Sequence, residues 1–218
     1  MQQFTVRCHQ WLAEALTARV AAEKELEELW RDAQRAMIPE FATPAEETAL
    51  HEAIQAEFDE LRKADQMLST RSALIIPALK AELEERGWMR RRWKPVPAGA
   101  RSRRGRRVGT PDQRFTHRFV VQLPDNLGER LVRACYNSSK KSVEGLQEWR
   151  LAFGDGPRGS LHKGKFWLGS GPSRTDLRRK DALLAGITYP PDVLRAAAQR
   201  VVATSEPDSA TLAADEPA

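Results

Sequence analysis

The fold class depends on residues 116–153, which read THRFVVQLPDNLGERLVRACYNSSKKSVEGLQEWRLAF. In this stretch Arg118, Val120 and Gln122 alternate with His117, Phe119, Val121 and Leu123. A period of two predicts a half-buried β-strand, and Pro124 ends it. Almost all other periodic segments repeat every three to four residues, as amphipathic helices do. We therefore expect a mainly α fold with a small β component, in the α+β class.

Two helices are expected after this strand. Asp125 is well placed to cap the first, in which Leu127, Leu131, Ala134 and Cys135 share a face. The polar run Asn137-Ser138-Ser139 interrupts the pattern, and Ser142 is expected to open a second helix that closes at Gly154.

The Leu123-Pro124-Asp125 junction and Ser142 make residues 116–153 similar to the ribbon-helix-helix DNA-binding family. This resemblance implies that two chains pair their strands and insert the ribbon into the major groove. Arg118, Val120 and Gln122 would then face the bases, while Ser142 and the amide of Val143 would hold a phosphate. Val120 is apolar at the central reading position, and the turn between the helices lacks glycine and is one residue longer. Another small α+β arrangement stays open.

Residues 1–88 are expected to form an acidic helical hairpin, with a third helix from Ser72 to Glu85. The first helix runs from about residue 9 to Met37. The second begins at Thr43, where Pro44 and Glu46 complete a capping box, and its apolar stripe extends to Leu68. Because the stripes are narrow, we expect coiled-coil-like homodimerisation through helices 9–68; a monomeric three-helix bundle is the alternative.

Charge is unevenly distributed along the chain. Residues 86–180 hold 24 Lys and Arg against 7 Asp and Glu, whereas residues 1–85 hold 9 against 17. Such segregation indicates a basic part that binds a polyanion. The expected nucleic-acid ligands in an arginine-rich, flexible linker over 89–113 are Arg90, Arg91, Arg92, Arg101, Arg103, Arg104, Arg106 and Arg107. A solvated spacer is the alternative, and Trp88 and Trp93 either stack on bases or anchor the linker.

A small basic domain over 114–202 is expected to complete the nucleic-acid interface. Its candidate ligands are Arg118, Gln122, Lys140, Lys141, Ser142, Lys163 and Lys165. A helix capped by Thr175 and ending at Gly186, and a last helix from Pro190 to about Val202, should follow. Residues 203–218 are expected to be disordered.

The remaining patterns argue against other classes of protein. No apolar run is long enough to span a membrane, and two isolated cysteines, Cys8 and Cys135, are typical of a cytoplasmic protein. No cofactor, metal or catalytic motif is recognisable, so we do not expect an enzyme, although a nuclease or priming protein using Tyr136, Tyr189 or a Ser or Thr hydroxyl stays open.

The sequence thus predicts a nucleic-acid-binding protein, with DNA favoured over RNA, that acts in transcription regulation or DNA maintenance. Two alternatives remain. One is a helical interaction or scaffold protein with an incidental basic region, and the other is an RNA- or ribosome-associated protein.

Overall fold

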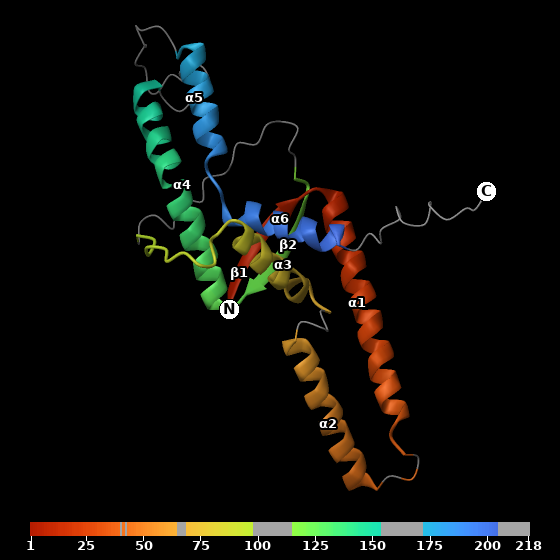
Figure 1. Ribbon diagram of the computed structural model, residues 1–218. Coiled ribbons are helices and arrows are strands. Elements are labelled where there is room, and N and C mark those ends of the chain that lie inside the picture. The colour runs from red at the N-terminus through yellow and green to blue at the C-terminus, as the bar shows by residue number, and fades with distance from the viewer. Residues whose placement is uncertain (40, 42, 65–68, 98–114, 154–171, 205–218) are drawn as a thin grey trace, which may run out of the picture.

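The computed structural model describes residues 1–39, 41, 43–64, 69–97, 115–153 and 172–204. These residues form a two-stranded sheet and six helices (Figure 1). In chain order the elements are β1 (Gln2–Cys8), α1 (Gln10–Ala36), α2 (Pro44–Lys63), α3 (Arg71–Glu85), β2 (His117–Leu123), α4 (Asp125–Phe153), α5 (Arg174–Ala185) and α6 (Pro190–Ala203). The expected mainly α, α+β class is confirmed.

The sheet joins two segments that are far apart in the sequence. Strand β2 is the strand predicted from the alternation, and it pairs antiparallel with β1, from Gln2 opposite Leu123 to Cys8 opposite His117. Its sheet partner therefore comes from the same chain. The resemblance had implied pairing with the same strand of a second chain.

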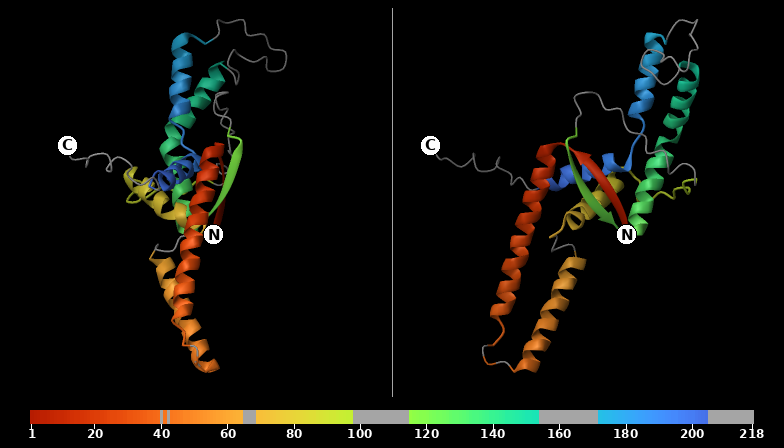
Figure 2. Two further views of the ribbon diagram at one scale, coloured as in Figure 1. Left: turned by 90° about the vertical axis from the view of Figure 1, so that its right-hand side faces the viewer. Right: turned by 180° about the vertical axis from the view of Figure 1, so that it is seen from behind.

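The hydrophobic core lies on one face of this sheet. Helices α3 and α6 cover that face, as the side view on the left of Figure 2 shows. The start of α1 and the first turns of α4 complete the core, and its fully buried side chains include Val6, Leu16, Leu79, Val121, Leu131 and Leu194. Both ends of the chain thus contribute to one core. The expected division into a helical unit over 1–88 and a separate domain over 114–202 is wrong, because β1 and α3 pack directly on β2 and α6.

Buried charge joins α3 to α6 at the edge of this core. Glu82 is 6% exposed. Its carboxylate accepts hydrogen bonds of 2.7 Å from Nε of Arg86 and 2.7 Å from Nε of Arg200, and Arg200 also contacts Glu85. Burial raises the pKa of the Glu82 carboxyl, but the hydrogen bonds from the two guanidinium groups outweigh it and hold this pKa below its ordinary value.

Two helical hairpins project from the core in opposite directions (Figure 1). The first consists of α1 and α2, and the predicted capping box of Thr43 and Glu46 at the start of α2 is confirmed. Helix α2 ends at Lys63, and Leu68 lies outside the described residues. Helix α3 packs on β2 and α6.

The second hairpin consists of α4 and α5, and it corrects two predictions. Helix α4 is continuous from Asp125 to Phe153, so the expected break at residues 137–139 is absent. The N-cap of α5 is Ser173, which forms a capping box with Asp176, and not Thr175. Gly145 lets the two helices approach closely, because a Cβ atom there would lie 2.8 Å from Cδ2 of Leu183.

None of the helices in the described part of the chain is both long and apolar enough to cross a membrane.

Candidate nucleic-acid interface

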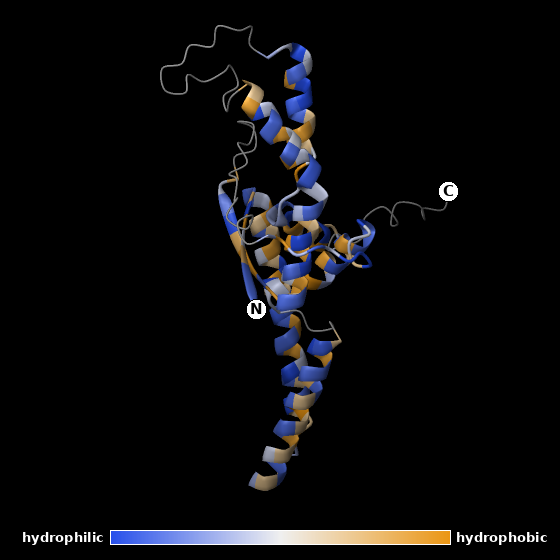
Figure 3. Ribbon diagram, turned by 90° about the vertical axis from the view of Figure 1, so that its left-hand side faces the viewer, coloured by the Kyte–Doolittle hydropathy of each residue, from blue (hydrophilic) through white to orange (hydrophobic). Residues whose placement is uncertain are grey.

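The open face of the sheet is the candidate site. Its six outward positions alternate with the core positions of the same strands: Gln3, Thr5 and Arg7 on β1, and Arg118, Val120 and Gln122 on β2. All six are exposed, and none of these described side chains is acidic. We call this set the ribbon face. A view along the sheet shows the helices gathered on its other side (Figure 3).

The register places like residues of the ribbon face side by side. Arg7 lies opposite Arg118, Thr5 opposite Val120, and Gln3 opposite Gln122. Directly opposed residues on one face of an antiparallel pair have Cβ atoms about 5 Å apart. One end of the ribbon face therefore carries two positive charges and the other end two amides.

The inward side chains hold the ribbon rigidly. Val6, Cys8, Val121 and Leu123 are completely buried, and Phe119 is 2% exposed. At the arginine end, the Arg195 guanidinium carbon lies 4.0 Å from the Phe115 ring centroid, and Arg195 Nε donates a 2.9 Å hydrogen bond to the Arg7 carbonyl. At the amide end, the backbone N–H of Gln122 donates a 2.9 Å hydrogen bond to Oγ of Ser72. The outward side chains are thus presented from a fixed backbone.

The ribbon face brings together two of the site residues predicted from sequence, Arg118 and Gln122. Gln3, Thr5 and Arg7 were missed because β1 was not predicted. The signal was present, since residues 2–8, Gln-Gln-Phe-Thr-Val-Arg-Cys, alternate polar and apolar residues from Gln3 onward.

Arg90, Arg91 and Arg92 lie away from the ribbon face. They belong to the stretch 88–97, which runs beside α4, where Arg130 donates to the Met89 carbonyl and Asn137 donates a 3.0 Å hydrogen bond to the Lys94 carbonyl. In the left view of Figure 2 this stretch and the strands lie on opposite sides of the molecule. The structure therefore does not join these three arginines to Arg118.

The two tryptophans of this stretch pack on each other. Trp88 and Trp93 meet edge to face at 6.0 Å, and Arg91 lies 4.5 Å over the Trp93 ring. Trp93 Nε1 also donates to the Trp88 carbonyl, and Trp88 packs against the core. These contacts favour the anchoring role, and the first part of the expected flexible linker is therefore held in place.

Lys140, Lys141 and Ser142 lie within α4, where the predicted phosphate site does not form. Because α4 is continuous, the amide of Val143 is inside the helix and is not one of the free amides at a helix N-terminus. Ser142 instead packs close to Gly186, and Lys140 lies 3.8 Å from Glu144. The other predicted ligands, Arg101, Arg103, Arg104, Arg106, Arg107, Lys163 and Lys165, lie outside the described residues.

Other potentially reactive groups in the described residues are buried or dispersed. Burial raises the pKa of the Cys8 thiol, and it raises the pKa of Cys135 to about 12, so neither thiol ionises readily. Within the described ranges, His, Cys, Asp and Glu form no group of three or more that could hold a metal ion.

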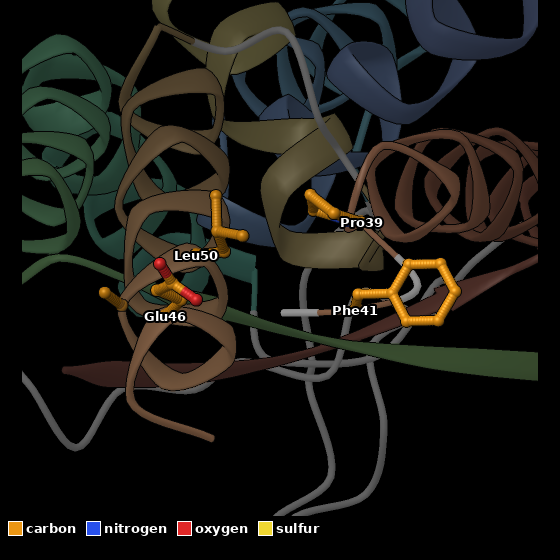
Figure 4. A pocket seen from close by; sticks show the side chains of 5 residues that line it. Pro39, Phe41, Glu46 and Leu50 are labelled. Atoms are coloured by element: carbon orange, nitrogen blue, oxygen red, sulfur yellow. The ribbon is translucent and has the colours of Figure 1, made fainter. Parts of the chain in front are cut away.

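A shallow depression lined by Pro39, Phe41, Glu46, Ala49 and Leu50 lies at the tip of the α1–α2 hairpin (Figure 4). Phe41 is 92% exposed there and points away from Leu50, so the depression does not enclose a ligand.

Comparisons of the chain with protein-family models, with curated proteins and with solved structures find no match.

Proposed function

We propose that this protein binds double-stranded DNA and inserts the ribbon face into the major groove. The observation that carries the proposal is the Arg7–Arg118 pair, which lies on an uncovered strand face without acidic residues while the opposite face is buried. The major groove of B-DNA is wide enough for a two-stranded ribbon. Each seven-residue strand extends over about 20 Å, which is enough to contact several base pairs.

The chemistry of the six side chains suits base readout. Arginine donates two parallel hydrogen bonds to guanine, and glutamine pairs with adenine through its amide. We assign guanine contacts to Arg7 and Arg118 and adenine contacts to Gln3 and Gln122. Val120, 38% exposed at the centre of the face, suits the methyl group of thymine.

The arginine-rich stretch supplies phosphate contacts in this proposal. Its last arginine, Arg107, is eight residues before Phe115 in the sequence, and the Phe115 ring lies 4.9 Å from that of His9 beside the arginine end of the ribbon face. Neutralised phosphates release counterions, which gives affinity that depends steeply on salt. Most of this salt-dependent affinity would come from Arg101, Arg103, Arg104, Arg106 and Arg107.

The ribbon geometry favours DNA over RNA as the partner. The major groove of A-form RNA is deep and narrow, so a two-stranded ribbon does not fit there. As its cellular role, the proposal includes transcription regulation or DNA maintenance. It places the protein in the cytoplasm, where the free thiols of Cys8 and Cys135 would stay reduced.

Fluorescence anisotropy tests the proposal with a labelled duplex that carries a site selected by the wild-type protein from a random library. The double variant Arg7→Ala/Arg118→Ala should lower affinity roughly tenfold or more, because one bidentate base contact contributes about 1–3 kcal/mol. Arg62→Ala/Lys63→Ala, which removes the same charge from exposed residues of α2, is the matched control and should leave affinity nearly unchanged. Equal losses in the two variants would contradict a specific role for the ribbon face.

A selected-site library separates base readout from phosphate binding. Gln122→Ala should relax the preferred sequence at one position and leave the salt dependence unchanged. Weak wild-type affinity for DNA that hardly changes with salt would instead favour the function of an interaction scaffold. Tighter binding to structured RNA than to DNA would favour the function of an RNA- or ribosome-associated protein.

A further inference from the structure

A second basic surface lies on the side of the molecule away from the ribbon face. Residues 86–97, which follow α3, contain five basic residues and no acidic one. Four of these basic side chains are exposed and have no carboxylate within ion-pair distance in the described part of the chain. Lys141 is exposed one turn beyond Asn137 on α4, and the Asn137 side chain is bonded to this stretch. We define the Trp93 surface as Arg90, Arg91, Arg92, Lys94 and Lys141.

The stretch that carries the Trp93 surface has a fixed backbone. Trp88 and Met89 pack against the core, and side chains of α4 donate hydrogen bonds to the carbonyls of Met89 and Lys94. The Arg91 guanidinium carbon lies 4.5 Å from the centroid of the Trp93 ring, which holds that arginine in place. Cations presented from a fixed backbone lose little conformational freedom when they bind a partner.

Most acidic side chains that flank the Trp93 surface on α3 and α4 are paired with other basic residues. These pairs are Glu82 with Arg86 and Arg200, Glu85 with Arg200, Glu129 with Arg133, Glu144 with Lys140, and Glu148 with Arg179. Glu84, near the end of α3, is exposed and has no such partner among the described residues. The Trp93 surface therefore keeps an excess of positive charge, which suits a polyanion.

The Trp93 surface and the ribbon face are separated by the core. The inward side chains of the strands and Trp88 pack against the same core, and the left view of Figure 2 shows the strands and residues 88–97 on opposite sides. A duplex seated on the ribbon face would have to turn around the core to reach the Trp93 surface. DNA has a persistence length of about 50 nm, so such a tight turn is costly. A second duplex can approach this surface directly.

We propose that the Trp93 surface binds the phosphate backbone of a second DNA duplex, so that the protein bridges two DNA segments. This inference rests on the proposed function of the ribbon face. Arginine pairs with phosphate through two parallel hydrogen bonds and needs no particular base sequence. The Trp93 ring is half-buried, its Nε1 donates to the Trp88 carbonyl, and Arg91 covers one of its faces. Little of the ring is left for stacking on unpaired bases, so the surface suits a duplex better than a single strand.

A capture assay tests the bridging. A duplex with a site selected by the wild-type protein is immobilised, protein is bound, and a labelled duplex without that site is added. The wild type should capture the second duplex. Arg90→Gln/Arg91→Gln/Arg92→Gln should capture at least about tenfold less and keep its affinity for the selected site within about twofold, because only contacts to the second duplex are lost. The matched control removes the same charge from exposed positions of α1 and α2: Lys24→Gln/Arg62→Gln/Lys63→Gln.

Salt dependence tests the Trp93 surface even where the ribbon face does not bind. In the Arg7→Ala/Arg118→Ala background, the three glutamine substitutions should reduce the slope of log affinity for a random duplex against log salt by about three. Arg92→Gln alone, which keeps the Arg91 contact, should reduce it by about one. Arg90→Lys/Arg91→Lys/Arg92→Lys should keep the slope, since lysine also pairs with phosphate. A failure of base readout and a failure of the Trp93 surface therefore give different results.

Several outcomes would overturn the proposal. One is capture and a salt slope that the glutamine variant leaves unchanged, and another is an equal loss in the control variant. An equal loss of affinity for the selected site would show that the surface contacts the first duplex. Self-association without DNA that the glutamine variant abolishes, measured by sedimentation velocity, would show that the surface binds the acidic part of another copy instead. Circular dichroism checks that all variants keep the wild-type helix content.

Discussion

At the scale of single residues, the Arg7–Arg118 pair shows a conflict between stability and the proposed function. Two like charges directly opposite each other on a sheet destabilise it. In the free protein the two arginines are directly opposed in the strand register, and a bound phosphate or guanine would relieve the repulsion between their charges.

We predict that Arg7→Thr keeps or raises the free energy of unfolding, by up to about 1 kcal/mol, while it weakens DNA binding. Threonine suits an exposed strand position, so the backbone should not change. Urea unfolding and anisotropy on the same preparation measure both quantities. A clear loss of stability would show that Arg7 has a structural role.

Glu82 gives a second prediction at this scale. Glu82→Gln should lower the free energy of unfolding by about 1–3 kcal/mol, because Arg86 and Arg200 would lose a buried, charged partner. Glu84→Gln, an exposed change on the same helix, is the control.

The effect of Glu82 should depend on pH. Its pKa in the folded protein lies below the 4.5 of the unfolded chain, so its stabilising contribution is fully present above that value. The contribution is lost as the pH falls through the lower, folded pKa. The difference in stability between wild type and Glu82→Gln should therefore shrink in acid, and a difference that stays constant down to the acid transition would argue against this network.

At the scale of elements, the start of α2 was a feature that could be predicted well. The capping box of Thr43 and Glu46 was recognised from local sequence, and Gly87, just after α3, carries a local signal of the same kind. Gly87 has φ of 68°; its amide donates to the Glu84 carbonyl and the Trp88 amide to the Leu83 carbonyl, which together form a Schellman motif. These signals are local because each involves neighbours within a few residues.

Gly87→Ala should lower the free energy of unfolding by about 1 kcal/mol, because a Cβ atom disfavours the left-handed conformation. Gly87→Asn should cost less, since asparagine tolerates this conformation better. Thermal unfolding of both variants checks the order. If alanine were as stable as glycine, the helix end would not depend on this backbone angle.

The elements that sequence analysis missed depend on distant partners. Strand β1 shows the same kind of alternation as β2, but β2 begins more than 100 residues later, so local patterns do not indicate that the two strands pair. In α4, Asn137 and Ser138 were expected to break the helix, but both side chains donate to carbonyls of their own helix. Ser139 is buried, where its Oγ accepts a hydrogen bond from the Thr188 amide. Tertiary contact thus stabilises a polar run that looks like a turn.

The same reasoning applies to the candidate site. Arg118 and Gln122 could be predicted because one strand shows its own alternation. Arg7 could not be placed beside Arg118 without the register of the sheet. The predicted phosphate site at Ser142 failed because it required a helix start that does not exist.

At the scale of the whole molecule, the acidic and basic parts of the chain do not form separate cores. The acidic first part contributes β1 and α3 to the same core as β2 and α6. We therefore predict that fragments 1–97 and 115–204 do not fold alone, and that mixing them restores helicity and cooperative unfolding. Circular dichroism during thermal unfolding tests this. Cooperative unfolding of 115–204 by itself would show that it is an independent domain.

The most direct test of the central claim is photocrosslinking from the ribbon face to DNA. A benzophenone side chain at Val120, at the centre of the face, should crosslink to bases of a bound duplex, whereas the same group at Phe41, on the distant hairpin tip, should not. Base crosslinks from position 120 that fall at one or two positions of a selected site would confirm major-groove insertion. Binding without any crosslink from position 120 would show that DNA lies on another surface and would contradict the account.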